Sequence, residues 1–590
     1  MNHAAVNDPE IRKLLERFSE ADRQKIIAGA ESLKETGDHT VNCEIGQKND
    51  DTGVRFALPE VRGGVVDVKV HREWKIQVND QHLADQTQTA LDALADVNDP
   101  PFVFNRARSL VRVVFDENGN PVISVLSEAG VRGILERCAE FVKIKADGSE
   151  IPAFPPREVV ADIMNLPEWQ AITIPPIVGI IEVPILLPDG NVIVKQGYNA
   201  ATRLYYAPAP GLVVPQLPDL PTKDDIDRAV GLIKEIFVDF PFMDKASRTN
   251  MIAILLTAVL RPMIHGPAPM AIIDKPQAGT GATLLSEVVA LIATGRPAAL
   301  MTAPEDEAAW RKAITSTLSQ GRNLAIVDNV ETKLYAAPLA AVLTSTTWTD
   351  RLLGRNDMIT LPHNMFWIST GNNLLLGGDL PRRCFWIRLD AKSARPWQRT
   401  DYRHPDLLKW VNIERGRILG AIATLARAWI LAGRPKPDQA VPKVGSFESW
   451  RDTIGGILAL CQMPEFLGNL EAMYEQADAD TPQWEAFIDR WGSIWPSHPV
   501  TVADVQAHIT IETNSTNIEY SGSGRLVDLL PDSLADAWAG KKNFSRVLGK
   551  ALARMNGRSF LNGYSLNKGK TSHNAVTWIV SRKPEKEGSL

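Results

Sequence analysis

The segment at residues 269–292 constrains the fold more than any other. It opens with an apolar run of strand length at 269–273 (PMAII), continues through a glycine-containing loop at 274–283 (DKPQAGTGAT) and ends in a helix-like stretch at 284–292. A strand, a glycine-rich loop and a helix in this order can aim backbone N–H groups at a bound phosphate. For the G-T-G tripeptide alone, a simple tight turn is the alternative. Alternating apolar blocks and helical segments on either side predict a parallel sheet flanked by helices.

One position in this phosphate loop departs from the usual pattern. The residues predicted to contact a nucleotide are Lys275, Ala278, Gly279, Thr280, Gly281, Ala282, Thr283 and Leu284. Gly279 and Gly281 let the backbone turn around the β-phosphate, and the Thr283 hydroxyl is a Mg²⁺ ligand. Ala282 stands where a lysine ordinarily supplies charge to the β- and γ-phosphates. Three interpretations stay open: an engineered lysine-to-alanine change, a natural variant whose charge comes from Lys275, or a protein that binds nucleotide without hydrolysing it.

A second apolar run, at 324–327 (LAIV), ends in Asp328 and Asn329. An acid at a strand tip beside the phosphate loop holds Mg²⁺ through water, so Asp328 is the predicted metal residue. The second acid that customarily polarises the attacking water is replaced by Asn329, with Glu331 close in sequence. For Asp328 alone, a helix cap or a turn is the simpler interpretation.

A third apolar run, at 365–370 (MFWIST), leads to Asn372 and Asn373. An amide at that strand tip can orient water against the γ-phosphate, and Asn372 is the predicted sensor. Arg382 and Arg383 follow on a loop before another apolar run, where a guanidinium can reach the γ-phosphate held by a neighbouring subunit. For either arginine alone, a surface salt bridge is the alternative.

The motifs P-x-x-G-T-G-A-T, L-A-I-V-D-N, F-W-I-S-T-G-N-N and D-L-P-R-R-C-F-W-I occur in that order. Residues 240–390 therefore resemble the ATPase core of superfamily 3 and related AAA+ replicative helicases of phages, viruses and mobile elements. The resemblance implies ATP and Mg²⁺ as cofactors and a ring, usually a hexamer, that pulls one DNA strand through its pore. Ala282 and Asn329 depart from the family pattern. These two departures affect the expectation of hydrolysis rather than that of nucleotide binding.

The same resemblance implies a β-hairpin that projects into the pore. Residues 349–353 and 358–361 fit its two strands, and the turn between them places Arg355 at the tip as a candidate contact for DNA phosphates. An ordinary exposed hairpin arginine is the alternative.

The predicted fold class is a multidomain α/β protein: an AAA+ P-loop ATPase core with an N-terminal α+β domain and a C-terminal winged-helix domain. Prolines at 205–221 (YYAPAPGLVVPQLPDLP) mark the clearest boundary, because proline disrupts helices and central strands. The predicted units are a helical segment and linker at 1–60, the α+β domain at 61–204, the Pro-rich linker at 205–221, the ATPase core at 222–434, a helical domain at 435–500, the winged helix at 501–582 and a tail at 583–590.

Charge is concentrated near one end of the chain. Residues 541–590 hold eleven Lys and Arg against two Glu, a local charge of +9, whereas the whole chain carries −6. A basic surface of this kind can meet nucleic-acid phosphates, although a solubilising tail or a protein-binding winged helix is the simpler alternative. The predicted DNA contacts are Arg355, Lys542, Arg546, Lys550, Lys568 and Lys570.

Four scattered cysteines without a C-x-x-C pair argue against a disulfide framework and a cysteine zinc site. No apolar run spans a bilayer and the first residues do not form a signal peptide, so a cytoplasmic protein without a membrane partner is expected. The first functional hypothesis is an ATP-dependent, ring-forming DNA helicase or translocase for replication of a phage or mobile element. Its expected partners are single-stranded, fork or origin DNA, further copies of the chain in a homo-hexamer, and a primase or other replication protein. The alternatives are a non-hydrolysing, ATP-binding assembly protein on DNA and an AAA+ remodeller of proteins.

Overall fold

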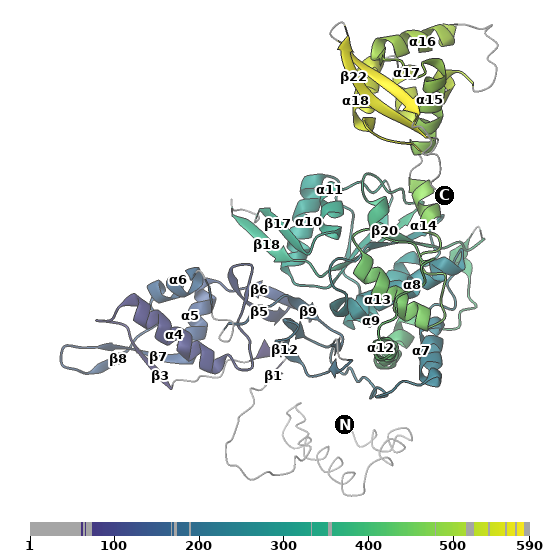
Figure 1. The fold of residues 1–590 in the computed structure, drawn as a ribbon. Helices are drawn as coiled ribbons and strands as arrows, with labels where there is room; N and C mark the ends of the chain where they lie inside the picture. The colour runs from purple at the N-terminus through teal and green to yellow at the C-terminus, as the bar shows by residue number, and fades with distance from the viewer. Residues whose placement is uncertain are drawn as a thin grey trace. The chain divides into compact units, whose positions relative to one another are not determined.

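The computed structural model describes most of the chain after residue 60 (Figure 1). The described residues are 61–62, 65–66, 73–166, 168–169, 174–187, 190–331, 333–351, 357–393, 395–477, 480–514, 524–540, 543–560, 563–572 and 575–582. Within these ranges no helix is both long and apolar enough to cross a bilayer. The predictions for 1–60 and 583–590 lie outside the described residues.

A five-stranded parallel sheet forms the middle of the chain, which confirms the predicted helix-flanked parallel sheet. Its order is β15–β16–β19–β14–β20, with every pairing parallel. The strands are β14 (Met270–Lys275), β15 (Leu300–Met301), β16 (Leu324–Val330), β19 (Phe366–Asn372) and β20 (Cys384–Arg388). β19 lies between the strand of the phosphate loop, β14, and the strand that carries Asp328, β16. The polar residues that follow these parallel strands therefore meet at one edge of the sheet.

Helices around this sheet share its hydrophobic core. They are α7 (Lys223–Ile236), α8 (Lys245–Leu260), α9 (Ala282–Thr294), α10 (Glu307–Ser319), α11 (Ala337–Leu343), α12 (Leu407–Leu431), α13 (Glu448–Leu460) and α14 (Leu470–Ala477), with 3-10 turns η1 (Arg261–Met263), η2 (Pro381–Arg383) and η3 (Pro396–Gln398). α8 is buried along nearly its whole length and contacts both β20 and α9. The predicted hairpin is present as β17 (Thr347–Arg351) and β18 (Met358–Pro362), paired antiparallel, with Trp348 packed against α10 through a hydrogen bond to Thr315. Arg355 lies outside the described residues.

The predicted helical domain at 435–500 is wrong as a separate unit. α13 and α14 pack into the core of the five-stranded sheet, and Trp450 of α13 contacts Phe385 of β20. α15 (Asp480–Ile494) instead joins the C-terminal core through Trp484 and Trp491. Tryptophans in helical segments are typical of buried helices. Residue type alone does not show which of two cores Trp450, Trp484 or Trp491 enters.

The C-terminal unit combines helices with a three-stranded antiparallel sheet of order β21–β23–β22. Its elements after α15 are β21 (Val500–Thr501), α16 (Val502–Asn514), η4 (Leu526–Leu529), α17 (Asp532–Ala539), α18 (Phe544–Met555), β22 (Tyr564–Ser572) and β23 (Ala575–Arg582). The unit ends in a helix followed by a two-stranded ribbon, as the sequence predicts. Lys568 and Lys570, two of the predicted DNA contacts, lie on strand β22 of this ribbon.

Among the small sheets of the N-terminal part, two three-stranded ones have separate cores. One combines strands β3–β7–β8 with α4, α5 and α6, and the other has the order β4–β5–β6. The elements are β1 (Val61–Arg62), β2 (Val65–Val66), β3 (Trp74–Gln77), α4 (Leu83–Val97), β4 (Phe104–Arg106), β5 (Ser109–Phe115), β6 (Pro121–Val125), α5 (Glu128–Cys138), β7 (Ala139–Ile144), β8 (Glu150–Pro152), α6 (Arg157–Asn165), β9 (Gly179–Ile181), β10 (Ile185–Leu186), β11 (Val192–Ile193), β12 (Gly197–Asn199) and β13 (Leu204–Tyr206). Residues 181–206 pack into the core of the five-stranded sheet, so the predicted boundary at residue 204 does not separate two cores.

The predicted Pro-rich linker, 205–221, packs against the unit that contains the five-stranded sheet. Tyr205 and Tyr206 belong to β13 and are buried, so its first two residues are strand. Further along, a Cβ atom at Gly416 of α12 would lie 1.9 Å from the carbonyl oxygen of Val213. Arg427, also on α12, donates a hydrogen bond to the Pro218 carbonyl at 3.0 Å. The segment therefore packs along α12.

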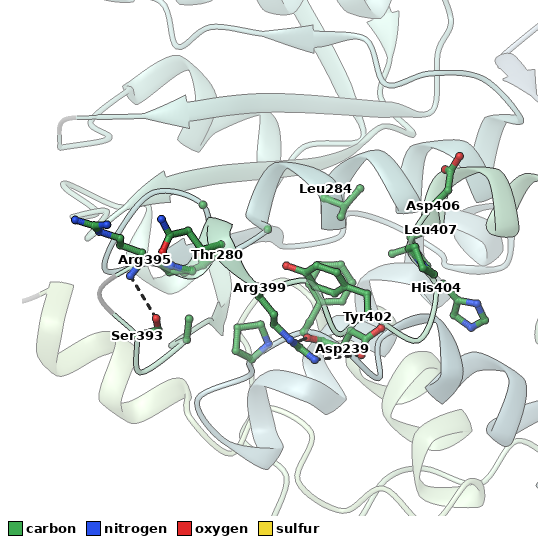
Figure 2. Close-up of a pocket in the computed structure, with 18 of the residues that line it drawn as sticks. Asp239, Thr280, Leu284, Ser393, Arg395, Arg399, Tyr402, His404, Asp406 and Leu407 are labelled. Carbon is green, nitrogen blue, oxygen red and sulfur yellow. Dashed lines mark hydrogen bonds and ion pairs between the residues drawn. The ribbon is translucent and has the colours of Figure 1, made fainter.

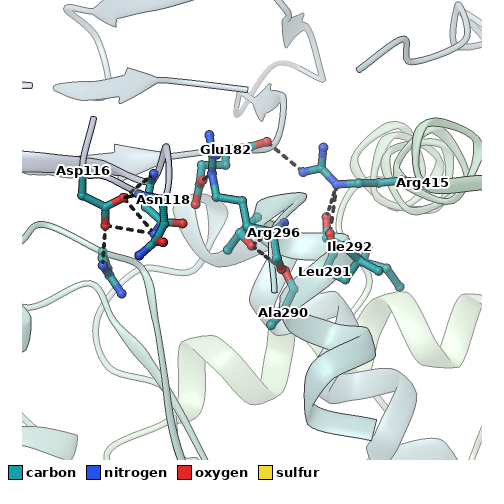
Figure 3. Close-up of polar contacts among 11 residues, drawn as sticks. Asp116, Asn118, Glu182, Ala290, Leu291, Ile292, Arg296 and Arg415 are labelled. Atoms are coloured by element: carbon teal, nitrogen blue, oxygen red, sulfur yellow. Dashed lines mark hydrogen bonds and ion pairs between the residues drawn. The ribbon is translucent and has the colours of Figure 1, made fainter. Parts of the chain in front are cut away.

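A buried polar network joins the N-terminal part to the far end of α9 (Figure 3). Arg296 Nε donates to Glu182 Oε1 at 2.7 Å, and both side chains are only 12% exposed. Arg415 of α12 donates to the carbonyls of Leu291 and Ile292 at 3.1 and 3.0 Å and to that of Glu182 at 3.0 Å. The Leu291 carbonyl also accepts the Gly295 N–H at 2.8 Å, whereas Ile292 lies in the last turn of α9, whose carbonyls a helix end leaves for other donors such as Arg415. Burial raises the pKa of Glu182 to about 7, against the opposing effect of Arg296.

Candidate nucleotide site

The phosphate loop joins β14 to α9 through two left-handed glycines. Gly279 has φ +80° and Gly281, the residue that precedes α9, has φ +94°. A Cβ atom would approach Trp397 to 3.1 Å at Gly279 and Phe240 to 3.0 Å at Gly281. Both the backbone conformation and the packing therefore favour glycine at these two positions. The helix that follows directs its free N–H groups and the positive end of its dipole toward the loop.

Thr283 and Asp328, predicted from separate motifs, are in contact. Thr283 Oγ1 donates to Asp328 Oδ1 at 3.1 Å, and Thr370 Oγ1 of β19 donates to the same oxygen at 2.6 Å. A hydroxyl and a carboxylate side by side at the start of α9 suit Mg²⁺, which prefers oxygen ligands and keeps several waters and substrate phosphates in its shell. The part of the chain that the structure describes holds no group of three His, Cys, Asp or Glu suited to a metal. A metal here would therefore depend on phosphate oxygens.

A β-bulge shapes the strand tip after Asp328. Asn329 has φ +53°, and the register with β19 shifts between Val327 and Val330. The Asn329 backbone N–H donates to Thr370 Oγ1 at 2.9 Å, and its side-chain amide donates to Glu331 Oε1 at 3.0 Å. Asn329 and Glu331 are both exposed. The bulge therefore places an amide and, bonded to it, a carboxylate next to the metal candidate.

The two asparagines after β19 have different surroundings. Asn373 donates its N–H to the Lys275 carbonyl at 2.9 Å and its side-chain amide to the Pro276 carbonyl at 3.3 Å, so it supports the phosphate loop. Asn372 lies opposite Lys275 in the sheet register, and its Oδ1 atom is buried without a hydrogen-bond partner. A buried polar atom without a partner is costly, so Asn372 is the member of the pair suited to a ligand or a water.

Sequence reasoning missed Asp274, the fully buried residue before Lys275. Asp274 Oδ1 accepts a hydrogen bond from the Leu374 N–H at 2.8 Å, and Arg388 Nε lies 3.6 Å from Oδ2. Burial raises the pKa of this carboxyl group. Asp274 therefore connects β14 to the loop after β19, through Leu374, and to the end of β20, through Arg388. A carboxylate directly after the apolar run at 269–273 was the available signal.

The two predicted finger arginines differ in exposure. Arg383 is 16% exposed, donates to Thr344 Oγ1 at 2.8 Å and also contacts the Ala340 carbonyl and Asp379. Arg382 is 71% exposed and pairs with Asp379 alone. A side chain held inside its own fold cannot extend to another molecule, so Arg382 is the better placed of the two.

A cavity of about 740 Å³ opens beside the phosphate loop (Figure 2). Gly279, Thr280, Gly281 and Leu284 line one side. The other side comes from 239–241 and from the segment 391–408 that follows β20, including Arg395, Arg399, Tyr402, His404 and Asp406. This volume lies in the range of small-ligand sites. Sequence reasoning did not include 391–408, although its Arg- and aromatic-rich stretch ARPWQRTDYRHPD was a signal.

The remaining predicted nucleotide contacts fall in two classes. Thr280 and Leu284 line the cavity, and Ala278 is exposed at the loop tip. Ala282 is fully buried, Lys275 is 7% exposed, and neither lines the cavity.

The predicted DNA contacts lie mainly in the C-terminal unit. Arg546 and Lys550 are exposed on α18, and Lys568 and Lys570 are exposed on β22. Arg546 and Lys568 line a groove of about 710 Å³ between α18, the start of α16 and the ribbon. Lys542 lies outside the described residues. The four basic side chains belong to one unit.

Comparison with known proteins gives distant likenesses only. No family model matches the sequence, and no curated protein matches it. A structure described as "SCCmec type IV Cch - active helicase" aligns with a TM-score of 0.30 and 9% identity, over 80% of this chain and 90% of that one. The JCV helicase, crystallised with a thiazolopyridine-phenoxyphenyl acetamide, aligns with a TM-score of 0.21 and 12% identity, over 43% of this chain and 66% of that one, just under two thirds. At these scores the likenesses carry no argument about the site.

Proposed function

We propose that the chain is a nucleoside-triphosphate-dependent motor on DNA, a helicase or translocase that works as a ring of identical subunits in replication of a phage or mobile element. The observation that carries the proposal is the contact of Thr283 with Asp328 next to the loop residues 279–281, which line the cavity. The start of α9 and the end of β16 supply the two oxygen ligands that a magnesium nucleotide needs.

The roles follow from position. The backbone of residues 279–283 would hold the phosphates, and segment 391–408 would hold the base and ribose of ATP. Bound Mg²⁺ would neutralise charge on the phosphates. Asn372 would accept a hydrogen bond from the attacking water through its unpartnered oxygen, or donate one from its amide N–H to the γ-phosphate. Arg382 would extend to the site of a neighbouring subunit.

The proposed DNA binding rests on the charge and exposure of four basic side chains. Arg546, Lys550, Lys568 and Lys570 are exposed on α18 and the ribbon, where a winged helix meets nucleic acid. Such contacts position a protein on phosphates without identifying bases. The hairpin β17–β18 would supply the second DNA contact, inside the pore.

The alternative is a DNA-binding assembly protein that binds ATP without hydrolysing it. Two observations favour it: the buried alanine at 282, and the bulge that presents Asn329 in place of an acid. In that case ATP would fix the ring rather than drive it.

Steady-state phosphate release, with and without single-stranded DNA, separates the two. The motor proposal expects turnover by the chain as written and faster turnover with DNA. Turnover only after Ala282→Lys would indicate an inactivated motor scaffold. If both forms are silent while ATP still promotes assembly, the non-hydrolysing alternative holds; strong turnover without DNA affinity would instead point to a remodeller of proteins.

A further inference from the structure

The phosphate loop lacks a cation of its own. Ala282 has no charge, and Lys275, the nearest lysine in sequence, is 7% exposed at the end of β14 and does not line the cavity. A triphosphate carries several negative charges, and sites that bind it supply arginine, lysine or a metal to offset them. If the cavity takes a triphosphate, a cationic side chain from another part of the chain should offset its charge.

Two arginines line the cavity, Arg395 and Arg399. Of these two, Arg399 has its guanidinium hydrogen-bonded to other groups of the protein. Arg399 donates to the Asp239 carbonyl at 2.6 Å and to Asp401 Oδ1 at 3.0 Å. Arg395 is exposed, and among the described residues its guanidinium has no ion-pair partner. The backbone N–H of Arg395 donates a hydrogen bond to Ser393 Oγ at 3.3 Å (Figure 2).

The segment that carries Arg395 is attached to the phosphate loop on both sides. Before it, the Gln277 side-chain amide donates to the Ser393 carbonyl. After it, Trp397 packs against Gly279, although its side chain stays 60% exposed. Between these two contacts, Arg395 cannot move far from the loop without breaking one of them.

We propose that Arg395 provides the phosphate-binding charge that Ala282 does not. Its guanidinium would bind the β- or γ-phosphate, where a planar fork can hold two oxygens at once. The inference rests on the proposed function, because it requires a nucleotide in the cavity. It explains how this loop can bind a triphosphate without a lysine.

The test is calorimetric titration of the full chain with Mg–ATP and with AMP. Arg395→Ala should weaken ATP binding by roughly 10- to 100-fold, the range for a lost charge-assisted hydrogen bond. AMP, which lacks the β- and γ-phosphates, should bind nearly as before. Arg395→Lys should retain part of the affinity for ATP. Lys409→Ala removes an exposed cation of α12 that lies outside segment 391–408 and does not line the cavity, and should bind ATP as the unmodified chain does.

The outcomes separate this inference from the proposed function. If the unmodified chain binds no ATP, the proposed function fails and the inference fails with it. If the unmodified chain and Arg395→Ala bind ATP equally, the inference is overturned and the proposed function stands. Equal losses for ATP and AMP would also overturn it, since they would place Arg395 on the base or ribose. Restored ATP binding in the double variant Arg395→Ala with Ala282→Lys would support it further.

Discussion

The two walls of the cavity are built differently. The phosphate wall, Gly279 to Gly281 with Leu284, leads from the end of β14 into α9. Behind it, Thr283, Asp328 and Thr370 form one hydrogen-bonded cluster. The opposite wall, 391–408, is a polar segment with only one short 3-10 turn before α12, and most of its side chains up to Arg403 are exposed. Strand tips position chemistry rigidly, whereas an exposed segment can adjust to its ligand. We therefore expect substitutions on the phosphate wall to have the larger effects, with Arg395, the proposed phosphate ligand of the opposite wall, as the exception.

The largest effect is expected for Asp328→Ala. It removes the carboxylate that accepts hydrogen bonds from Thr283 and Thr370 and is the candidate metal ligand. Where the chain turns over ATP, the rate should fall by about 100-fold or more, as for loss of one preorganised transition-state contact. Asp227→Ala, which removes an exposed carboxylate of α7 away from the proposed site, is the matched control. An unchanged rate and an unchanged Mg²⁺ dependence in Asp328→Ala would remove this residue from the site.

Glu182→Gln tests the anchor at the far end of the phosphate-loop helix. The pKa of Glu182 is about 7 when folded and about 4.5 when unfolded, so between these values the folded state binds more protons and its stability falls as pH rises. Glutamine does not titrate. The stability of the variant relative to the unmodified chain should therefore improve from pH 4.5 to pH 8, by at most about 3 kcal/mol.

Denaturant midpoints at a series of pH values measure this difference. A difference that stays flat, or that shifts toward the unmodified chain as pH rises, would mean that the Arg296 ion pair outweighs burial and keeps Glu182 ionised.

Gly281→Ala tests the backbone of the phosphate wall. A side chain at φ +94° and 3.0 Å from Phe240 should lower the free energy of unfolding by about 1–2 kcal/mol. It should also weaken ATP binding, because the loop must shift. Gly231→Ala, in helix α7 with open space around it, is the control and should stabilise slightly. Equal urea midpoints for the two variants would show that the loop tolerates other conformations.

Tyr402→Ala tests the opposite wall and should have the smallest effect. Loss of an aromatic contact with the base is expected to weaken binding by about 2- to 10-fold. The same factor should apply to ATP, ADP and AMP in calorimetric titrations, because the base is common to all three. A loss that grew with the number of phosphates would contradict the assignment of this wall to the base.

The same contrast separates what the sequence predicts from what it does not. The glycine loop, Asp328 and Asn372 could be predicted because apolar runs mark strands and the polar residue after each run lies at one sheet edge. The role of Asn373, the bulge at Asn329 and the confinement of Arg383 depend on hydrogen bonds across elements, which spacing does not contain.

Segment 391–408 was missed for a topological reason. It becomes a wall of the cavity because β20 lies beside β14, and strand order is not visible in one sequence. Core membership is similarly hidden. Trp450 and Trp484 both read as buried helix residues, yet they belong to different cores, which is why the predicted 435–500 domain was wrong.

The central claim is that a nucleotide lies in the cavity, with its phosphates on the 279–283 loop and its base against 391–408. Photocrosslinking with 8-azido-ATP and Mg²⁺, followed by peptide mapping, tests it most directly. The account predicts saturable labelling within 391–408 or at 239–241 that excess ATP abolishes. Labelling confined to another part of the chain, or labelling that ATP does not compete away, would contradict it.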